Sequence, residues 1–521
     1  MNELPPITGQ DSHKSLEANI GMTSRVVRGS LWVLGGQVVG VLAALLATPF
    51  VIRLLGTEQY GLLALTNVLF TYLVFADMGM GIASTRFGAG AHARKDEQTE
   101  ILAIWTSLVI ASVPALLIAF SLALGARVLV QQFLLLPPHL HETAIVVVRL
   151  TALGFFARAV AGVLNTPQLV RLRMDLMTLI TTGTSVIQIA MVPIVLLLGG
   201  GLIGAVSVIA GTSILGAILH LTVSSRLLPG MLRPVVRREL FKPILRFGSG
   251  LVASSLAAVL LTHGEKLLLT RYASVTAFAH YTVAFTLASM VTLAPAAMGQ
   301  SLLPAFSRLQ SDKNALEQLY RRALRGTLLW IVPTAVLLAV MAKPFFTLWA
   351  GPDFGRASTV PFYILAAGLV FNALAHVPYI MLMALDRTKV IARVHLAELV
   401  PYLLVAGVLT YRFGAVGAAF AWSMRIVVDA LVFFLAARRI TGFAWSPWPE
   451  NSSAYVLALV LLLVPVLLVS LVVNSSLLRL LVLLVTFAGY CALVLTRVLN
   501  KDERASMLRL VPGLSMIGRV A

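Results

Sequence analysis

Residues 454–473 read AYVLALVLLLVPVLLVSLVV, a run of 20 residues without a charged side chain. About 20 apolar residues in an α-helix cross the hydrocarbon core of a bilayer, because each residue adds about 1.5 Å along the axis. Comparable runs recur along the whole chain. They fall at 29–52, 59–82, 101–125, 143–165, 175–198, 201–222, 247–270, 277–300, 326–350, 358–384, 390–411, 413–437, 454–473 and 476–498. The pattern predicts an all-α polytopic membrane protein with about 14 transmembrane helices.

The composition supports lipid as the main solvent of the chain. Hydrophobic residues make up 59% of the 521 residues and charged residues only 12%, whereas a soluble domain carries about 25% charged residues. The net charge of +19 does not indicate a nucleic-acid partner, because the excess lies in short loops between apolar runs. Cys491 is the only cysteine, so no internal disulfide is expected. The polar first 23 residues do not resemble a cleavable signal peptide.

The distribution of lysine and arginine predicts the orientation in the membrane. With a cytoplasmic N-terminus, 29 of the 40 basic residues fall in cytoplasmic segments and only 6 on the opposite face. Cytoplasmic loops of membrane proteins carry such an excess. We therefore expect a multi-pass protein of the bacterial inner membrane with both termini in the cytoplasm.

The loop lengths predict the domain organisation. The expected parts are a cytoplasmic N-terminal tail (1–27), an N-lobe of helices 1–6 (28–222), a cytoplasmic interfacial linker (223–246), a C-lobe of helices 7–12 (247–440), two further helices (441–498) and a cytoplasmic C-terminal tail (499–521). In the linker, the apolar side chains of Leu240, Phe241, Ile244 and Leu245 are expected to face lipid, and the basic ones water and headgroups.

Two short matches suggest that the lobes are repeats. Gly201 and Gly204 align with Gly414 and Gly417 at an offset of 213, each pair in a short turn before a predicted span. A second match, between the segments that start at 57 and 275, has an offset of 218. Chance similarity between apolar helices is the alternative. Many transporters are built from such repeats, and one bundle rocks against the other around a central site.

Several segments resemble a known family. The run 50–61, FVIRLLGTEQYG, and the run 77–81, DMGMG, followed by Arg86, look like the opening helices of Wzx-like polysaccharide and O-antigen flippases. These proteins form the polysaccharide transporter branch of the multidrug/oligosaccharidyl-lipid/polysaccharide exporter superfamily. Leu245–Gly248 and the span from Pro295 to Pro304 fit the same pattern. Residues 263–266, HGEK, depart from it, because such proteins often show a single aspartate before a basic residue there.

The resemblance implies a function and its partners. The expected cargo is undecaprenyl-pyrophosphate carrying a short glycan, moved from the cytoplasmic to the outer leaflet for O-antigen, capsule or exopolysaccharide synthesis. A polysaccharide polymerase and the chain-length machinery are implied partners besides the lipid bilayer. No cofactor, metal or enzymatic activity is expected, since the sequence has no nucleotide-binding loop, metal-ligand spacing or nucleophile motif.

Charged residues inside predicted spans are candidates for the transport site, because they are costly in lipid. Arg425 lies near the middle of span 12, with Asp429 at i+4 on the same face. It is either an anion-binding group or half of an ion pair that holds the helix in its bundle. Arg149 and Arg158 in span 4 are nine residues apart and hence on opposite faces. We expect Arg425, Arg158, Arg149 and Lys266 to bind substrate.

Acidic residues and one histidine are candidates for ion coupling or gating. Glu265 lies beside Lys266 near the predicted outer end of span 7. His395 and Glu398, spaced i, i+3, are either a proton-responsive pair or side chains that reach toward the cytoplasm. Asp77 lies near the inner end of span 2, where it could also cap a helix or pair with Arg86. Asp429 completes this group of candidates.

Two other functions stay open from the sequence. A drug or small-metabolite antiporter of the same superfamily would need an acidic cavity, and the embedded charges here are of both signs. A membrane-embedded glycan polymerase or ligase would need a large outer loop, whereas the predicted outer loops are short.

Overall fold

A computed structural model describes residues 9–72, 79–443, 452–472 and 476–499, and these residues form helices and short connections without a strand. Ten of the described helices are long and apolar enough to cross a membrane. This confirms the all-α polytopic fold, while the count of fourteen spans stays a prediction. The chain forms two compact units, Met1–His263 (unit 1) and Gly264–Ala521 (unit 2). Their boundary falls inside a single helix, α9 (Arg238–Tyr272).

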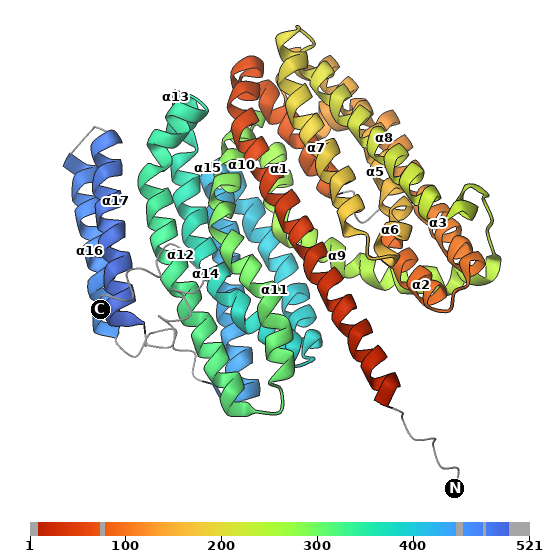
Figure 1. Cartoon of the computed structure of the whole chain (residues 1–521). Coiled ribbons are helices and arrows are strands. Elements are labelled where there is room, and N and C mark those ends of the chain that lie inside the picture. Colours follow the sequence, from red (N-terminus) through yellow and green to blue (C-terminus); the bar gives the residue numbers. More distant parts are fainter. Residues whose placement is uncertain (1–8, 73–78, 444–451, 473–475, 500–521) are drawn as a thin grey trace. The chain divides into compact units, whose positions relative to one another are not determined.

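Unit 1 is a bundle of long helices and short turns. Its helices are α1 (Gly9–Tyr72), α2 (Met80–Ala93), α3 (Glu97–Leu124), α4 (Ala126–Val128), α5 (His141–Leu164), α6 (Thr166–Val170), α7 (Met174–Leu197), α8 (Gly201–Leu227) and the first part of α9 (Figure 1). Helix α5 packs on α3 and α8, and α7 packs on α1 and α8. Asp96 caps α3 by accepting a hydrogen bond from the Thr99 N–H at 2.9 Å. Hydrogen bonding to Thr99 lowers the pKa of Asp96.

Unit 2 contains the remaining helices. They are α10 (Val275–Ser289), α11 (Leu293–Arg308), α12 (Lys313–Trp349), α13 (Pro352–Ala357), α14 (Thr359–Ala384), α15 (Thr388–Thr441), α16 (Ser452–Val472) and α17 (Ser476–Leu493). Helix α14 lies at the centre of this packing and contacts α10, α11, α12 and α15. Helices α16 and α17 pair with each other and pack on α12. A 3-10 turn, Met290–Thr292, separates α10 from α11 inside the span that the sequence predicts as one helix.

Glycines with positive φ interrupt the two longest helices. The backbone leaves the helical conformation at Gly56 in α1 (φ 75°, ψ 167°) and at Gly414 in α15 (φ 55°, ψ −131°). Each position separates two predicted spans. Gly201, which the sequence aligns with Gly414, has the same φ of 55°. Both glycines thus have a positive φ, which residues with a Cβ rarely adopt.

Replacing Gly414 by alanine is expected to destabilise unit 2 by about 1–3 kcal/mol, the range for a residue forced into a sparsely populated backbone conformation. Crowding does not contribute, since a Cβ there would be 4.0 Å from its nearest neighbour, Ala273. Gly407 is the matched control, because it lies in the same helix with open space around its Cβ position. Thermal unfolding in detergent should show a lower midpoint for Gly414→Ala and no decrease for Gly407→Ala. Equal midpoints would contradict the role of the positive φ.

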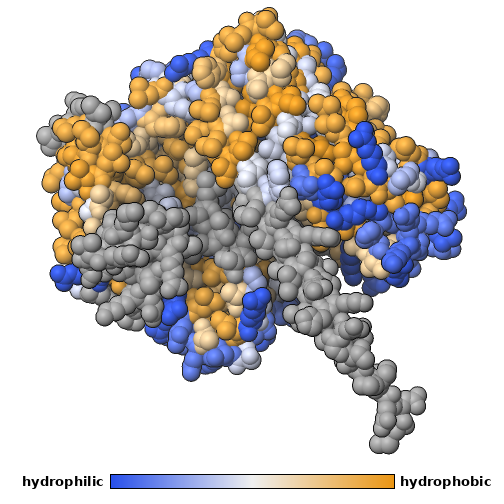
Figure 2. Space-filling view, in the orientation of Figure 1, coloured by the Kyte–Doolittle hydropathy of each residue, from blue (hydrophilic) through white to orange (hydrophobic). Residues whose placement is uncertain are grey.

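The surface of the described helices is largely apolar. Orange residues cover much of the visible face in Figure 2, and hydrophilic residues gather at the lower right, around the position of α2. Large side chains such as Leu404 and Val408 are 66% and 59% exposed. Such exposure is typical of a protein whose helices are solvated by lipid.

The interfacial linker differs from its sequence-based prediction. Ile244 is fully buried in a core cluster of unit 1, and Leu240 and Phe241 pack against the same cluster. The Nε1–H of Trp105 donates to the Met231 carbonyl at 2.8 Å and ties the linker to α3. The expectation that Ile244 faces lipid is therefore wrong, since this side chain packs against protein. Leu245 is 40% exposed, as expected.

Candidate functional site

The predicted site residues that the structure describes fall into separate groups in the two units. Arg158 and Arg149 belong to unit 1, and the residues from Glu265 to Asp429 belong to unit 2. Asp77 lies outside the described residues.

Arg158 lines a polar cavity of about 360 Å³ inside unit 1, between α5, α7 and α8. The side chains around it are mainly hydroxyls and amides, with no carboxylate. They are Arg158, Asn165, Thr181, Thr184, Ser185, Gln188, Thr212, Ser213 and His220, together with Ala161, Gly162 and Gly216. We call this site the Arg158 cavity.

The guanidinium of Arg158 has no carboxylate partner among the described residues. Its Cζ lies 4.8 Å from the centre of the Phe70 ring. Asn165 Oδ1, on the same cavity, is buried without a hydrogen-bond partner in the described part of the chain. Within the described residues, the cavity therefore combines a cation that has no carboxylate partner with unused hydrogen-bonding capacity, which suits an anionic ligand that also carries hydroxyl groups.

His220, which lines the cavity, belongs to a hydrogen-bonded group of side chains. Gln168 Nε2 donates to Ser224 Oγ at 3.1 Å, and Ser224 Oγ donates to the Leu164 carbonyl at 2.7 Å. His220 Nδ1 lies 3.2 Å from Gln168 Oε1. Arg149 does not line this cavity, and its Nε instead donates to the Ala123 carbonyl at 3.4 Å.

Arg425 forms an ion pair with Glu398, not with Asp429. Arg425 Nη1 lies 3.2 Å from Glu398 Oε1, and the two side chains are only 10% and 11% exposed. The i+4 spacing makes Asp429 one possible partner, but the interruption at Gly414 divides α15 into two segments that can pack together. Glu398 comes from the segment before Gly414 and Arg425 from the segment after it.

His395 and Asp429 complete this cluster in unit 2. Ligand atoms of His395, Glu398 and Asp429 lie within 4.8 Å of one another. Glu398 Oε2 and Asp429 Oδ1 are buried without hydrogen-bond partners in the described residues. Asp429 thus lies beside Glu398, and no ion pair joins it to Arg425 in the described part of the chain. These three side chains could bind a proton or a cation, although the positive charge of Arg425 beside them opposes a metal ion.

Glu265 and Lys266 are buried in unit 2. Glu265 Oε2 accepts a hydrogen bond from the Tyr402 hydroxyl at 2.7 Å, and its Oε1 accepts one from Tyr281 at 3.1 Å. Lys266 Nζ lies 3.9 Å from the centre of the Phe285 ring. Tyr402 also lies under Arg425, whose Cζ is 5.6 Å from its ring centre. The tyrosine therefore connects Glu265 to the Arg425 cluster.

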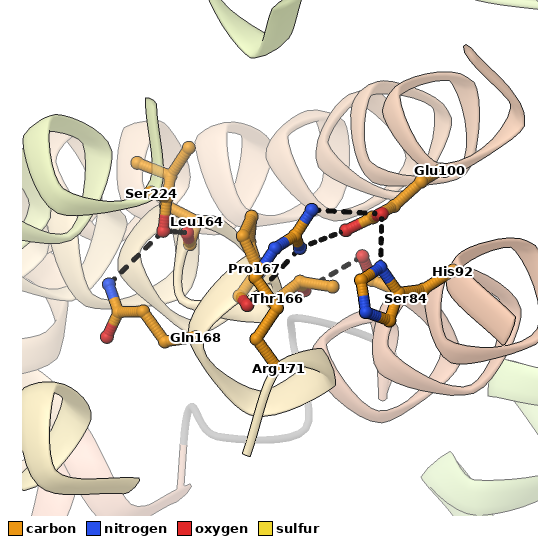
Figure 3. Close-up of polar contacts among 9 residues, drawn as sticks. All are labelled: Ser84, His92, Glu100, Leu164, Thr166, Pro167, Gln168, Arg171 and Ser224. Atoms are coloured by element: carbon orange, nitrogen blue, oxygen red, sulfur yellow. Dashed lines mark hydrogen bonds and ion pairs between the residues drawn. The ribbon is translucent and has the colours of Figure 1, made fainter. Parts of the chain in front are cut away.

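A second group of charges in unit 1 was missed by sequence reasoning. Glu100 is fully buried in α3, and Arg171 Nη1 and Nη2 donate to its two carboxylate oxygens at 2.5 and 3.3 Å (Figure 3). His92 Nδ1 lies 3.4 Å from Glu100 Oε2. The Thr166 hydroxyl donates to Ser84 Oγ at 2.9 Å beside this pair. The orientation analysis counts Arg171 only as a charge in a cytoplasmic loop. Glu100, an acidic residue at the start of an apolar run, was a usable signal.

Comparison with known proteins defines the class of this protein. Its fold resembles that of the lipid II flippase MurJ in an inward closed conformation, with a TM-score of 0.72 and 13% identity, covering 89% of this chain and 98% of that one. An inward-facing MATE multidrug transporter of the MOP superfamily aligns with a TM-score of 0.66 and 16% identity, over 77% and 94% of the two chains. These similarities show that the chain shares the helical fold of these proteins.

The family follows from a sequence model. The model of the polysaccharide biosynthesis protein family matches residues 50–359, and the chain belongs to this family. A putative O-antigen transporter from Shigella flexneri is 23% identical over 192 residues, which make up 37% of this chain. The match spans 46% of that relative, less than half of its length. The resemblance to Wzx-like flippases is confirmed at the level of the family.

Proposed function

We propose that this protein is a flippase that moves an undecaprenyl-pyrophosphate-linked oligosaccharide from the cytoplasmic to the outer leaflet by alternating access. The Arg158 cavity is the observation that carries the proposal. It places a guanidinium that has no carboxylate partner in the described residues among hydroxyl and amide side chains inside a bundle of membrane helices. Membership of the polysaccharide biosynthesis family and the likeness to a lipid II flippase support the same substrate class.

The chemistry of the cavity matches the head group of such a lipid. A pyrophosphate that leaves water needs cationic donors, and arginine binds phosphate oxygens with two parallel N–H groups. Sugar hydroxyls find partners in side chains such as Gln188, Thr212 and Asn165. Moving the anion outward is favoured by an inside-negative potential, by about 2.3 kcal/mol per charge per 100 mV.

In this proposal, charged residues of unit 2 couple transport to protonation. Arg425 pairs with Glu398, and Asp429 and His395 lie close to that carboxylate, so protonation of Glu398 would loosen the ion pair and release the arginine for an anion. Arg149 and Lys266 stay candidates for substrate binding, and Glu265 and Asp77 stay candidates for coupling or gating. The predicted lobe boundaries, the inner-membrane location, the cytoplasmic termini and the polymerase as a partner belong to this proposal as well.

Arg158→Ala tests the proposal directly. Transport of a fluorescent undecaprenyl-pyrophosphate-linked glycan in proteoliposomes is expected to fall roughly ten- to a hundredfold, since a hydrogen bond to a charged group contributes about 1.5–3 kcal/mol. Folding should be retained, because no ion pair is broken. Arg158→Lys should keep part of the activity, because lysine retains the positive charge but lacks the planar group that binds phosphate through two N–H donors.

Arg226→Ala, which removes an exposed arginine at the end of α8, is the control and should transport normally. Full activity of Arg158→Ala would refute the anion site.

The acidic cluster of unit 2 and the likeness to multidrug transporters favour an antiporter as a second candidate. Transport of an organic cation that is unaffected by Arg158→Ala, together with no transport of the glycolipid, would establish that candidate instead.

A further inference from the structure

The hydrogen-bonded group beside the Arg158 cavity fixes the orientation of the Gln168 amide. Ser224 Oγ has one hydrogen, which it donates to the Leu164 carbonyl at 2.7 Å (Figure 3). The same oxygen must therefore accept the bond that joins it to Gln168 Nε2 at 3.1 Å. Gln168 Nε2 also lies 3.4 Å from the backbone carbonyl of His220, which can only accept. Gln168 Oε1 consequently faces the His220 ring.

This orientation determines which nitrogen of His220 carries a proton. An amide oxygen only accepts, so the contact of 3.2 Å between Gln168 Oε1 and His220 Nδ1 requires a hydrogen on Nδ1. In the neutral imidazole, Nε2 is then a hydrogen-bond acceptor. His220 lines the cavity, whereas Gln168 does not. The ring nitrogen that is left for a ligand is thus Nε2, to which no described residue donates.

The charges around the cavity favour the neutral form of His220. Of the described residues that line the cavity, Arg158 alone carries a permanent charge, and none is a carboxylate. A protonated imidazole would add a second positive charge without an anionic partner, at a residue that is only 4% exposed. We therefore expect His220 to present an acceptor to the cavity.

A second unused acceptor lies close to the same hydrogen-bonded group. Asn165 Oδ1 lines the cavity and is buried without a hydrogen-bond partner in the described part of the chain. The adjacent Leu164 carbonyl belongs to the group that holds His220. Arg158 lies seven positions earlier, about 10 Å along α5. The cavity therefore has a cationic part at Arg158 and an accepting part at Asn165 and His220.

We propose that His220 determines specificity for the sugar: its Nε2 accepts a hydrogen bond from a hydroxyl or acetamido N–H of the head group, while Arg158 binds the phosphate. This inference rests on the proposed function and assigns the two parts of the head group to the two parts of the cavity. An ionised phosphate offers only acceptor oxygens, which suit the guanidinium and cannot donate to His220. A sugar supplies the donors that the two unused acceptors need.

His220→Asn isolates the proposed contact. The amide nitrogen of asparagine can replace Nδ1 as the donor to Gln168, while nothing replaces Nε2. Isothermal titration calorimetry on the purified protein at about pH 8, where an ordinary imidazole is neutral, measures the binding of two kinds of probe. They are inorganic pyrophosphate and the 1-diphosphates of glucose, galactose and N-acetylglucosamine.

The variant should lose affinity for the sugar and not for the phosphate. For the sugar diphosphate that binds the wild-type protein most tightly, affinity is expected to fall about three- to tenfold, the loss of one hydrogen bond. Affinity for inorganic pyrophosphate should not change. His220→Gln should keep more of the sugar affinity, because its amide oxygen can take the place of Nε2. His139→Asn, the same substitution at an exposed histidine outside the cavity, is the control and should bind both probes normally.

The outcomes separate this inference from the proposed function. Unchanged binding of both probes in Arg158→Ala would refute the anion site and the function that rests on it. If Arg158→Ala weakens binding while His220→Asn binds the sugar diphosphate normally, the role of His220 alone is overturned. Equal losses for pyrophosphate and sugar diphosphate in His220→Asn would also overturn it, because His220 would then contact phosphate. The same holds if no sugar diphosphate binds the wild-type protein more tightly than pyrophosphate.

A phospholipid is the other source of a phosphate that carries hydroxyl donors, since the head group of phosphatidylglycerol has two. Glycerol 3-phosphate is the probe for that source. We expect it to bind the wild-type protein more weakly than the sugar diphosphate and to bind His220→Asn with unchanged affinity. A loss as large as that of the sugar diphosphate would show that His220 reads any hydroxylated phosphate, and the assignment to a sugar would be overturned.

Discussion

Arg425→Ala is expected to abolish transport and to reduce the yield of folded protein. The substitution leaves Glu398, which is 11% exposed, without its cation and close to the buried Asp429. Breaking a buried ion pair by removing one partner costs about 3–5 kcal/mol, because the remaining charge is desolvated without compensation. Arg425→Lys should retain some activity, since the charge stays while the planar donor group is lost. Transport in proteoliposomes and the midpoint of thermal unfolding are the two measurements.

A double variant distinguishes a structural from a functional arginine. Arg425→Leu combined with Glu398→Leu removes both members of the pair and should recover most of the lost stability, as replacing a buried pair by apolar residues often does. If Arg425 binds the anionic substrate, this double variant should fold and still fail to transport. A folded double variant with normal transport would show that the ion pair only holds the two segments of α15 together.

Glu100→Ala is expected to destabilise unit 1 by about 3 kcal/mol. Glu100 is fully buried and accepts hydrogen bonds from both Nη groups of Arg171, which is itself only 15% exposed. The pair joins the start of α3 to the segment that follows α6. Its loss should lower the midpoint of thermal unfolding and increase proteolysis between Val170 and Met174.

Two controls make the Glu100 prediction specific. Asp175→Ala removes the partner of Arg173 from a pair that is 47% and 38% exposed, and such pairs contribute about 0–1 kcal/mol. Glu100→Leu combined with Arg171→Leu should recover stability relative to Glu100→Ala, because no unpaired buried charge remains. An unfolding midpoint of Glu100→Ala equal to that of the wild-type protein would show that this network does not stabilise unit 1.

Several features of the site were accessible from sequence. Arg158 and Arg149 were placed on opposite faces of one helix from their spacing, and the structure assigns only Arg158 to the polar cavity. The depth of Arg425 in an apolar run makes it a candidate from the sequence. The structure pairs it with Glu398 and not with Asp429, because i, i+4 spacing reports neighbours within one helix and not those on a packed segment.

The sequence by itself determined that the chain is a helical membrane protein. The length and charge of each apolar run are local properties, and they can be compared with the thickness of the bilayer for each helix separately. Only the tertiary structure decided which charges meet. Glu398 reaches Arg425 across 27 positions, and Glu100 reaches Arg171 across 71. The Arg158 cavity also depends on how α5, α7 and α8 pack together. Such contacts arise from packing between distant segments, and no local pattern specifies them.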